Sequence, residues 1–399
     1  MGNTSSSGWA KAVAVSIAAA CGLVACAGEP APTAPPADTP AGAARQAFVE
    51  ALRPRPGRTL PLVAVLALNE GTETTDFLVP HAVLRRASGL RVEAVAPRRG
   101  LVTLMPALSV RVDTDFAGFD QAHPDGADYV VVPALHAEDD PAVRAWLRSQ
   151  AARGAIVIGV CSGARVLARA GLLDGREFTG HWHDRGDLAG LAPGSRHLPD
   201  RRYAIDRGVA TTTGVSASLP VALALVEAVD GSARAAALAG EYGLSDWGPA
   251  HRSAEFRLRP GGVLTYLWNG AAFWAHETMG IAVRDGDDDV QLAFAADAWA
   301  RSGRSEVIAV GPAASTSVRL RSGLALSVTP PGDAGKFRPL TLPTGLPPAR
   351  QLDLSLCEIG RRHGDATRRW VALLMEHPLP GNRPQQEAPG CDAPSPPPS

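Results

Sequence analysis

Short apolar runs alternate with helical patterns along residues 59–230. Most of these runs are too short for a helix and too continuously apolar for a strand with one wet face, so both of their faces are predicted to be buried. A chain that alternates such strands with helices folds into a doubly wound parallel sheet of the α/β class. The predicted strands are "LPLVAVLAL", "LRVEAVAP", "ADYVVVPAL", "AIVIGV" and "GVATTTG".

The first 26 residues predict a secretory signal, with a polar start and a short apolar run that ends in small residues. Leu23–Cys26 resembles the bacterial lipobox, in which the cysteine receives a diacylglycerol; an ordinary signal with a chance cysteine is the alternative. Residues 27–58 are rich in proline and alanine and predict a linker. Because Ala27 carries no aspartate retention signal, lipidation at Cys26 predicts a membrane anchor in the cell envelope, on the periplasmic side of the outer membrane.

Charge and glycine pattern exclude two classes of partner. The chain has 39 basic and 40 acidic residues, so it offers no basic surplus for a nucleic acid. It also lacks the glycine-rich loops that cradle nucleotide phosphates. We therefore predict no nucleic-acid partner and no cofactor, and a small molecule as the substrate or ligand.

Five cysteines occur, and two of them belong to the signal. Cys391 lies in the tail 381–399, which is predicted to be disordered. Cys357 and Cys391 form the one pairing that leaves Cys161 unused, and the count implies no disulfide framework. Cys161 is therefore predicted to be a free thiol in an oxidising compartment.

Residues 231–380 predict a second, less regular α/β region. "HAVLRRASGLRVEAVAPRRGLVTLMPALSVRVD" and "AADAWARSGRSEVIAVGPAASTSVRLRSGLALSVT" share the order helix, Ser-Gly, strand, loop and strand. This echo predicts a degenerate half-repeat from about residue 289, with generic α/β punctuation as the alternative. No second strand–cysteine–helix unit is expected, because Cys357 lies in a helical pattern.

Cys161 stands where the strand "AIVIGV" turns into the helix "SGARVLARAG". Ligands bind at the carboxyl ends of strands in open α/β sheets, and a sharp strand–helix turn pushes its side chain into a cleft. The positive end of the helix is expected to lower the pKa of the thiol, while Gly163 permits the tight turn. Cys161 is therefore a candidate nucleophile, and a small buried hydrophobic residue is the alternative.

The segment "GVCSGARVLARAGLLDGREFTGHW" resembles the DJ-1/PfpI superfamily, especially its branch of isocyanide hydratases and amidase-like domains of AraC-type regulators. The matching elements are Gly159–Ala164, Leu167–Gly175 and Thr179–Trp182. The resemblance implies a flavodoxin-like, class I glutamine amidotransferase-like fold over 59–230. A homodimer and an internal pseudo-dimer both stay open, and the C-terminal region either caps the pocket or mimics a dimer partner. Residues 231–380 do not show the helix-turn-helix pattern of the regulators.

The resemblance further implies an acidic residue from the first strand–helix turn that hydrogen-bonds the cysteine. In "NEGTETTDFLVPHAVL" the matching residue is Asp76. A carboxyl group beside a thiolate should have a raised pKa, and Asp76 would then relay a proton to the sulfur or the substrate. Capping of the helix N-terminus is the alternative for Asp76, and Glu70 and Glu73 are nearby rivals.

His181 occupies the position of the superfamily's histidine, which implies a general base beside the cysteine. The alternative is a structural histidine beside Trp182, and His183 is a weaker candidate. These residues form a dense group with Asp184, but the family resemblance explains them without a metal. No metal site is predicted.

One turn departs from the family pattern. Relatives commonly carry two glycines after the third strand, whereas this chain has "VPALH". The backbone N–H groups of Leu135 and Ser162 are predicted to line an oxyanion pocket, but the missing glycines weaken the prediction of an amidase-type oxyanion hole. His136 is placed either near the pocket or in the loop. Ser216 and Ser218 are predicted to be helix caps.

Two functions of different classes fit these residues. The first is a lipid-anchored enzyme in which Cys161 attacks or hydrates a small amide, isonitrile-like or carbonyl compound, with Asp76 as proton relay. The second is a non-catalytic ligand-binding or redox-sensing lipoprotein, in which Cys161 oxidises reversibly and Asp76 stabilises the sulfinate. The "VPALH" turn favours the second function, and the set of Cys161, Asp76 and His181 favours the first. A structural envelope module fits only a closed pocket.

Overall fold

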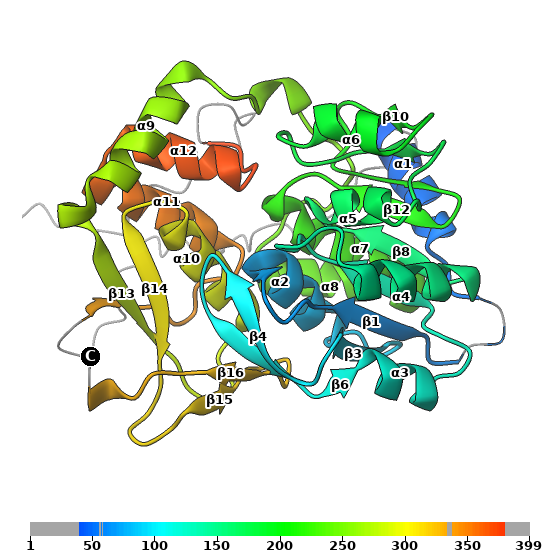
Figure 1. Ribbon diagram of the computed structural model, residues 1–399, viewed down its shortest axis with the longest axis horizontal. Helices are drawn as coiled ribbons and strands as arrows, with labels where there is room; N and C mark the ends of the chain where they lie inside the picture. Colours follow the sequence, from blue (N-terminus) through cyan, green and yellow to red (C-terminus); the bar gives the residue numbers. More distant parts are fainter. Residues whose placement is uncertain (1–39, 56, 58, 333–336, 380–399) are drawn as a thin grey trace, which may run out of the picture. The chain divides into compact units, whose positions relative to one another are not determined.

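The computed structural model describes residues 40–379 except 56, 58 and 333–336 (Figure 1). The predicted signal with its lipidation site and the C-terminal tail lie outside the described residues. Helix α1 (Pro40–Ala51) lies inside the segment predicted as a linker. Phe48 and Leu52 are buried in the main core, so this part of the segment belongs to the fold.

The first half of the chain forms a seven-stranded sheet (Figure 1). Its five central strands are parallel and follow the spatial order second, first, third, fourth, fifth, which is a doubly wound, flavodoxin-like order. The α/β prediction is confirmed. Across the sheet the strands are β11 (Tyr203–Asp206), β12 (Val209–Thr212), β8 (Ile156–Gly159), β7 (Tyr129–Val132), β1 (Leu62–Leu66), β3 (Arg91–Ala96) and β6 (Thr114–Asp115).

Strand β1 shows why its run is apolar at every position. Val63 and Val65 belong to one core cluster, and Leu62, Ala64 and Leu66 belong to another. Successive side chains point to opposite faces of a strand, so β1 is buried on both sides. The first cluster includes α2 (Thr74–Leu84), α7 (Ser218–Asp230) and α8 (Ser232–Tyr242); the second includes α3 (Phe116–Ala122), α4 (Pro141–Ala152), α5 (Gly163–Arg169) and α6 (Arg185–Leu191).

The second half repeats the element order of the first. It runs β13 (Glu277–Ala282), α10 (Asp289–Ala300), β14 (Ser305–Val310), β15 (Ser317–Arg319) and β16 (Ala325–Ser327), as the first half runs β1, α2, β3, β4 (Gly100–Met105) and β5 (Ser109–Val112). The first and third members of each set pair in parallel, and the last two form a hairpin. This order agrees with the predicted half-repeat. It starts at β13, earlier than predicted, because the sequence echo omitted the strand before α10.

Equivalent elements of the two halves contact each other. Helix α2 packs against α10. Strand β5 pairs antiparallel with β16, so one five-stranded sheet, which also includes β2 (Thr72–Glu73), contains strands of both halves. Like-with-like contact is the geometry of a twofold interface. Two contacts, α2 with α10 and β5 with β16, follow this like-with-like pattern.

The second half also has a three-stranded sheet of its own, in the order β14, β13 and β17 (Arg338–Leu340). Cys357 lies in a helix and is disulfide-bonded, which the cysteine count had not implied, whereas Cys161 is a free thiol. No helix of residues 40–379 that the structure describes is long and apolar enough to cross a bilayer. The remaining elements are β9 (Glu177–Phe178), β10 (Arg196–His197), α9 (Pro260–Ala271), α11 (Arg350–His363) and α12 (Asp365–Leu374).

Candidate functional site

Cys161 lies in the sharp turn between β8 and α5. Its φ angle of 55° is in the left-handed region, which few non-glycine residues adopt and which stores strain. The backbone N–H donates to Oγ1 of Thr212 at 3.1 Å, and the residue is only 5% exposed. The structure therefore places the cysteine in the kind of elbow that the sequence predicts.

Gly163 holds this elbow against the neighbouring strand. A Cβ atom at this position would lie 2.0 Å from the carbonyl oxygen of Val132, at the end of β7. The glycine is thus required because backbone approaches backbone, not because of a left-handed φ angle. The close approach brings the start of α5 to the carboxyl end of β7.

Asp76 lies in the first turn of α2 and is fully buried. One of its carboxylate oxygens accepts from the N–H of Ala134 at 3.3 Å, and the other accepts from the hydroxyl of Ser218 at 3.3 Å. The helix is capped instead by Glu73, which accepts from the N–H of Asp76 at 2.5 Å. Glu70 is exposed and pairs with an arginine on the surface. The capping role proposed as an alternative for Asp76 therefore belongs to Glu73.

The pKa values of Asp76 and Cys161 are set by burial and by neighbouring charges rather than by the N-terminus of helix α5. Burial raises the pKa of Asp76 to about 7, although the N–H of Ala134 and the charge of Arg301 oppose the shift. Burial also raises the pKa of the Cys161 thiol well above its ordinary value, and the charges of Asp76 and Glu73 add to it. The expectation that the helix terminus lowers this pKa is wrong in direction, because desolvation and nearby carboxylates act more strongly on the buried thiol.

Arg301 is one of two residues at the site that sequence reasoning missed. It follows α10, in the second half, yet its guanidinium reaches Glu73 at 2.6 Å and Asp297 at 2.5 Å. Asp297 is fully buried and accepts from the hydroxyl of Thr75 at 2.7 Å. Arg301 lowers the pKa of Cys161, against the effect of the carboxylates. The second half therefore supplies a cation to the cysteine site of the first.

His181 is held by the second half rather than by the cysteine. Its Nε2 lies 3.3 Å from the carbonyl oxygen of Leu374, at the end of α12, and its ring contacts Trp182. Burial lowers its pKa. These contacts favour the structural role that was the alternative for His181. His183 has a side chain that is 65% exposed and pairs with Asp184.

Glu376, just after α12, is a second residue that sequence reasoning missed. It is 1% exposed, accepts from the N–H of Gly214 at 2.6 Å and pairs with His251 at 3.1 Å. Its own carbonyl accepts from the hydroxyl of Ser216 at 2.7 Å. The end of α12 is thereby fastened to the loop after β12, beside His181.

The other predicted pocket residues have separate roles. Ser162 donates its hydroxyl to Asp184. Leu135 is buried. His136 is exposed, and its backbone N–H donates to the carbonyl of Gly71, so His136 is a loop residue rather than part of the pocket. Ser216 and Ser218, which were predicted to cap helices, do not, because Gly214 and Ala217 occupy the N-cap positions. Their hydroxyls donate to the carbonyl oxygen of Glu376 and to the carboxyl of Asp76.

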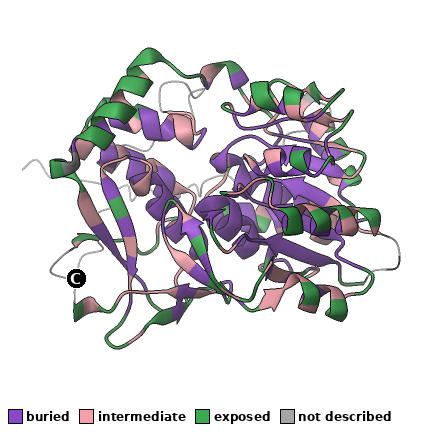
Figure 2. Ribbon diagram, viewed as in Figure 1, coloured by how far each residue is buried: buried purple, intermediate pink, exposed green. Residues whose placement is uncertain are grey.

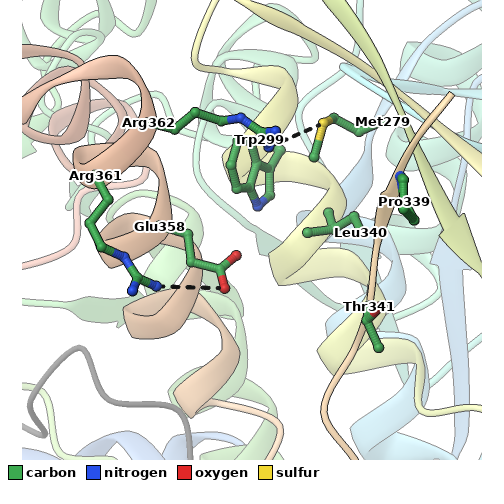
Figure 3. Close-up of a pocket in the computed structure, with 8 residues that line it drawn as sticks. All are labelled: Met279, Trp299, Pro339, Leu340, Thr341, Glu358, Arg361 and Arg362. Carbon is green, nitrogen blue, oxygen red and sulfur yellow. Dashed lines mark hydrogen bonds and ion pairs between the residues drawn. The ribbon is translucent and has the colours of Figure 1, made fainter.

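A separate cavity of about 520 Å³ lies in the second half, between α10, α11 and β17 (Figure 3). Arg362 stacks over the ring of Trp299 at 5.6 Å, and the buried indole N–H of Trp299 has no hydrogen-bond partner. Arg361 pairs with Glu358 at 3.9 Å. The cavity contains none of the residues around Cys161. Residues 40–379, as far as the structure describes them, hold no His, Cys, Asp and Glu group arranged for a metal.

Asp76 gives the site a testable pH dependence. Its folded pKa of about 7 exceeds the ordinary value of about 3.9, so folding favours the protonated form. This contribution is complete at low pH and is lost as the pH rises through about 7. We expect the free energy of unfolding to fall by roughly 2 kcal/mol between about pH 5 and pH 7 from this group.

Asp76→Asn should remove the contribution of this residue to the fall in the free energy of unfolding with pH, because the amide stays neutral. Urea unfolding at a series of pH values measures it, with Asp113→Asn, at a side chain that is 79% exposed, as the matched control. Equal pH slopes for the wild type and Asp76→Asn contradict the buried, protonated Asp76.

Comparison with known proteins adds a family. A model of the DJ-1/PfpI family matches residues 62–228. The isonitrile hydratase of Pseudomonas putida is 35% identical over 162 residues, which cover 39% of this chain and 67% of that protein. The Parkinson disease protein 7 homolog of Danio rerio is 28% identical over 189 residues, 46% of this chain and 97% of that protein. A THiJ/PfpI family protein from Pseudomonas syringae has a crystal structure with a TM-score of 0.41 and 28% identity, covering 46% of this chain and 75% of that one.

Proposed function

The chain belongs to the DJ-1/PfpI family, and from this membership we propose that it is a cysteine-dependent hydrolase or hydratase of small molecules. The strained turn that buries Cys161 among Asp76, Glu73 and Arg301 carries the proposal. Its substrate has an electrophilic carbon, as in an isonitrile, an amide or a carbonyl compound. The similarity to an isonitrile hydratase supports the first of these classes.

The chemistry begins with a proton transfer, since Cys161 rests as a thiol. Asp76 ionises near neutral pH and accepts this proton. In an isonitrile, the thiolate bonds to the terminal carbon and Asp76 returns the proton to that carbon, which gives a thioimidate with no leaving group. In an amide, the thiolate bonds to the carbonyl carbon, the C–N bond breaks and Asp76 returns the proton to the departing amine. Water then displaces the sulfur, and the thiol forms again. Arg301 favours the thiolate in the first step, because its charge lowers the pKa of Cys161.

Two backbone groups are suited to the charge that develops on the substrate. Among the hydrogen bonds of the described residues, the N–H groups of Ser162 and Leu135 have no acceptor. The N–H of Ala134 is different, since it donates to Asp76. Free, fixed N–H groups near a nucleophile stabilise an oxyanion. His181 takes no part in this mechanism.

Redox sensing or ligand binding is the second candidate, and the burial of the site favours it. Cys161 is 5% exposed and His181 is 8% exposed, with the end of α12 fastened beside the histidine. A sulfinate formed on Cys161 by peroxide would accept a hydrogen bond from protonated Asp76. In this candidate the same residues hold an oxidised cysteine rather than a substrate.

The location is part of the proposal. We place the protein in the cell envelope, held by a lipid on Cys26. The lipobox-like sequence before Cys26 supports this location. The disulfide of Cys357 also supports it, because disulfides persist in oxidising compartments.

A substrate panel separates the two candidates. Wild type, Cys161→Ser and Asp76→Asn are incubated with an alkyl isonitrile, a primary amide and a dicarbonyl compound, and products are followed by NMR. The enzyme proposal expects turnover of at least one class, its loss in Cys161→Ser and a slower rate in Asp76→Asn. His183→Ala is the control and should keep full turnover.

Turnover that survives in Cys161→Ser excludes this cysteine as the nucleophile. If no class is turned over and mass spectrometry shows peroxide adding two oxygen atoms to Cys161, the sensor candidate holds. Asp76→Asn should then make the oxidised form less stable.

A further inference from the structure

Helix α9 exposes an apolar surface. Nine large hydrophobic side chains are exposed among the described residues, and seven of them lie between residues 258 and 274. Figure 2 colours the outer side of this helix as exposed. Such a patch marks an interaction site, because soluble proteins rarely leave large contiguous apolar areas in water. The α9 surface consists of Leu258, Val263, Leu264, Tyr266, Leu267, Trp268 and Trp274.

The helix packs on the fold through its small and polar residues. Asn269 is 2% exposed and donates to the carbonyl of Ser302 at 2.8 Å and to the hydroxyl of Thr367 at 3.1 Å. A Cβ on Gly262 would lie 3.3 Å from the ring of Trp370. This is the reverse of an ordinary surface helix, which buries its apolar side. The hydrogen bonds of Asn269 therefore fix the apolar side outward.

The charges around the α9 surface indicate what it binds. No Asp, Glu, Lys or Arg occurs from Pro260 to Ala275, while Arg257 and Arg259 just before the helix are exposed. Tryptophan, tyrosine and leucine bordered by arginine are the side chains of helices that lie in a membrane interface. We propose that the α9 surface binds an anionic lipid bilayer, with the arginines at the lipid phosphates.

A second copy of the chain is a poorer occupant. The α9 surface contains no acidic side chain that could pair with Arg257 and Arg259 of another copy, whereas lipid phosphates pair with them directly. The proposal is independent of the proposed activity.

Hydroxyl-radical footprinting of the full chain tests the proposal, since it reports on single side chains. The protein is oxidised with and without vesicles of phosphatidylethanolamine and phosphatidylglycerol, and modified residues are counted by mass spectrometry. We expect vesicles to slow the modification of Leu264, Leu267 and Trp268 by about tenfold. Leu60 and Leu101, which are 49% and 56% exposed elsewhere, are the matched controls and should react at unchanged rates.

A variant confirms the contact. In a Cys26→Ser background, Leu264→Ser/Leu267→Ser/Trp268→Ser should bind these vesicles about tenfold more weakly than the background, and Leu60→Ser/Leu101→Ser should not. Circular dichroism and labelling of Cys161 check that both variants are folded.

Three results overturn the proposal. The first is equal modification of the α9 surface with and without vesicles. The second is slow oxidation of the α9 surface, relative to Leu60 and Leu101, that occurs without vesicles and becomes slower as the protein concentration rises. This result assigns the surface to a second copy. The third is equally slow oxidation of the α9 surface, relative to Leu60 and Leu101, at every protein concentration without vesicles. This result assigns the surface to another segment of this chain.

Discussion

Replacing Arg301 with alanine is expected to lower the free energy of unfolding by about 3 to 5 kcal/mol, because it strands buried carboxylates without a cation. Arg301 contacts both Glu73 and Asp297, whose side chains are 7% and 0% exposed. Glu73 already has a raised pKa from burial and from the charges of Asp297 and Asp76. Removing Arg301, whose charge acts against these effects on Glu73, leaves the buried carboxylates without that compensation on folding.

Chemical denaturation measures the loss, and a second variant shows its cause. Arg301→Ala/Asp297→Asn should recover part of the stability, since the amide still accepts from Thr75 and carries no charge. Arg98→Ala is the matched control: it breaks an exposed pair with Glu70 and should cost less than about 1 kcal/mol. A loss in Arg301→Ala no larger than that of the control contradicts the buried network.

Arg301→Ala should also change the thiol. Because Arg301 lowers the pKa of Cys161, its removal should move the iodoacetamide labelling profile of Cys161 to higher pH. Arg301→Lys keeps the charge and should move the profile less. This readout separates an electrostatic role from a purely structural one.

Gly163→Ala is expected to destabilise the fold by more than about 3 kcal/mol. The added Cβ would lie 2.0 Å from the carbonyl oxygen of Val132 and 3.1 Å from that of Pro133. Both atoms belong to backbone, so no side chain can move aside to relieve the clash. Either α5 shifts away from β7 and moves Cys161, or the strand is distorted.

Gly190→Ala in α6 is the matched control, because nothing lies within 4 Å of its added Cβ. Alanine in a helix there should be neutral or slightly stabilising. Thermal and urea unfolding compare the two variants, and labelling of Cys161 reports on the elbow. If Gly163→Ala matches the control in stability, the close approach of α5 and β7 is wrong.

Several sequence predictions succeeded because their causes are local. The apolar run of β1 reflects burial on both faces, which a five-residue strand reveals directly. The change of pattern at Cys161 marks the end of β8 and the start of α5, so the elbow can be seen in ten residues. The N-cap of α2 was not identified: capping was the alternative for Asp76, whereas Glu73 caps the helix although glutamate is not among the residue types that usually do so.

The sequence predictions that failed depend on side chains that are close in space but distant in the chain. The pKa of Cys161 was expected to fall because a helix begins beside it, yet burial and carboxylates raise it. Arg301 and Glu73 are 228 positions apart, and Glu376 and Gly214 are 162 positions apart. Neither contact leaves a spacing signal in the sequence.

The sequence by itself determined the alternation of strands and helices and the strand–cysteine–helix turn, and it indicated part of the repeated order of elements in the second half. These are properties of short segments, governed by side-chain periodicity and by turn chemistry. Only the tertiary structure decided the charge around Cys161, the partner of His181 and the outward direction of the α9 surface. Coulomb interactions and desolvation depend on distance in space, and the packing of α10 and α12 against the first half sets those distances.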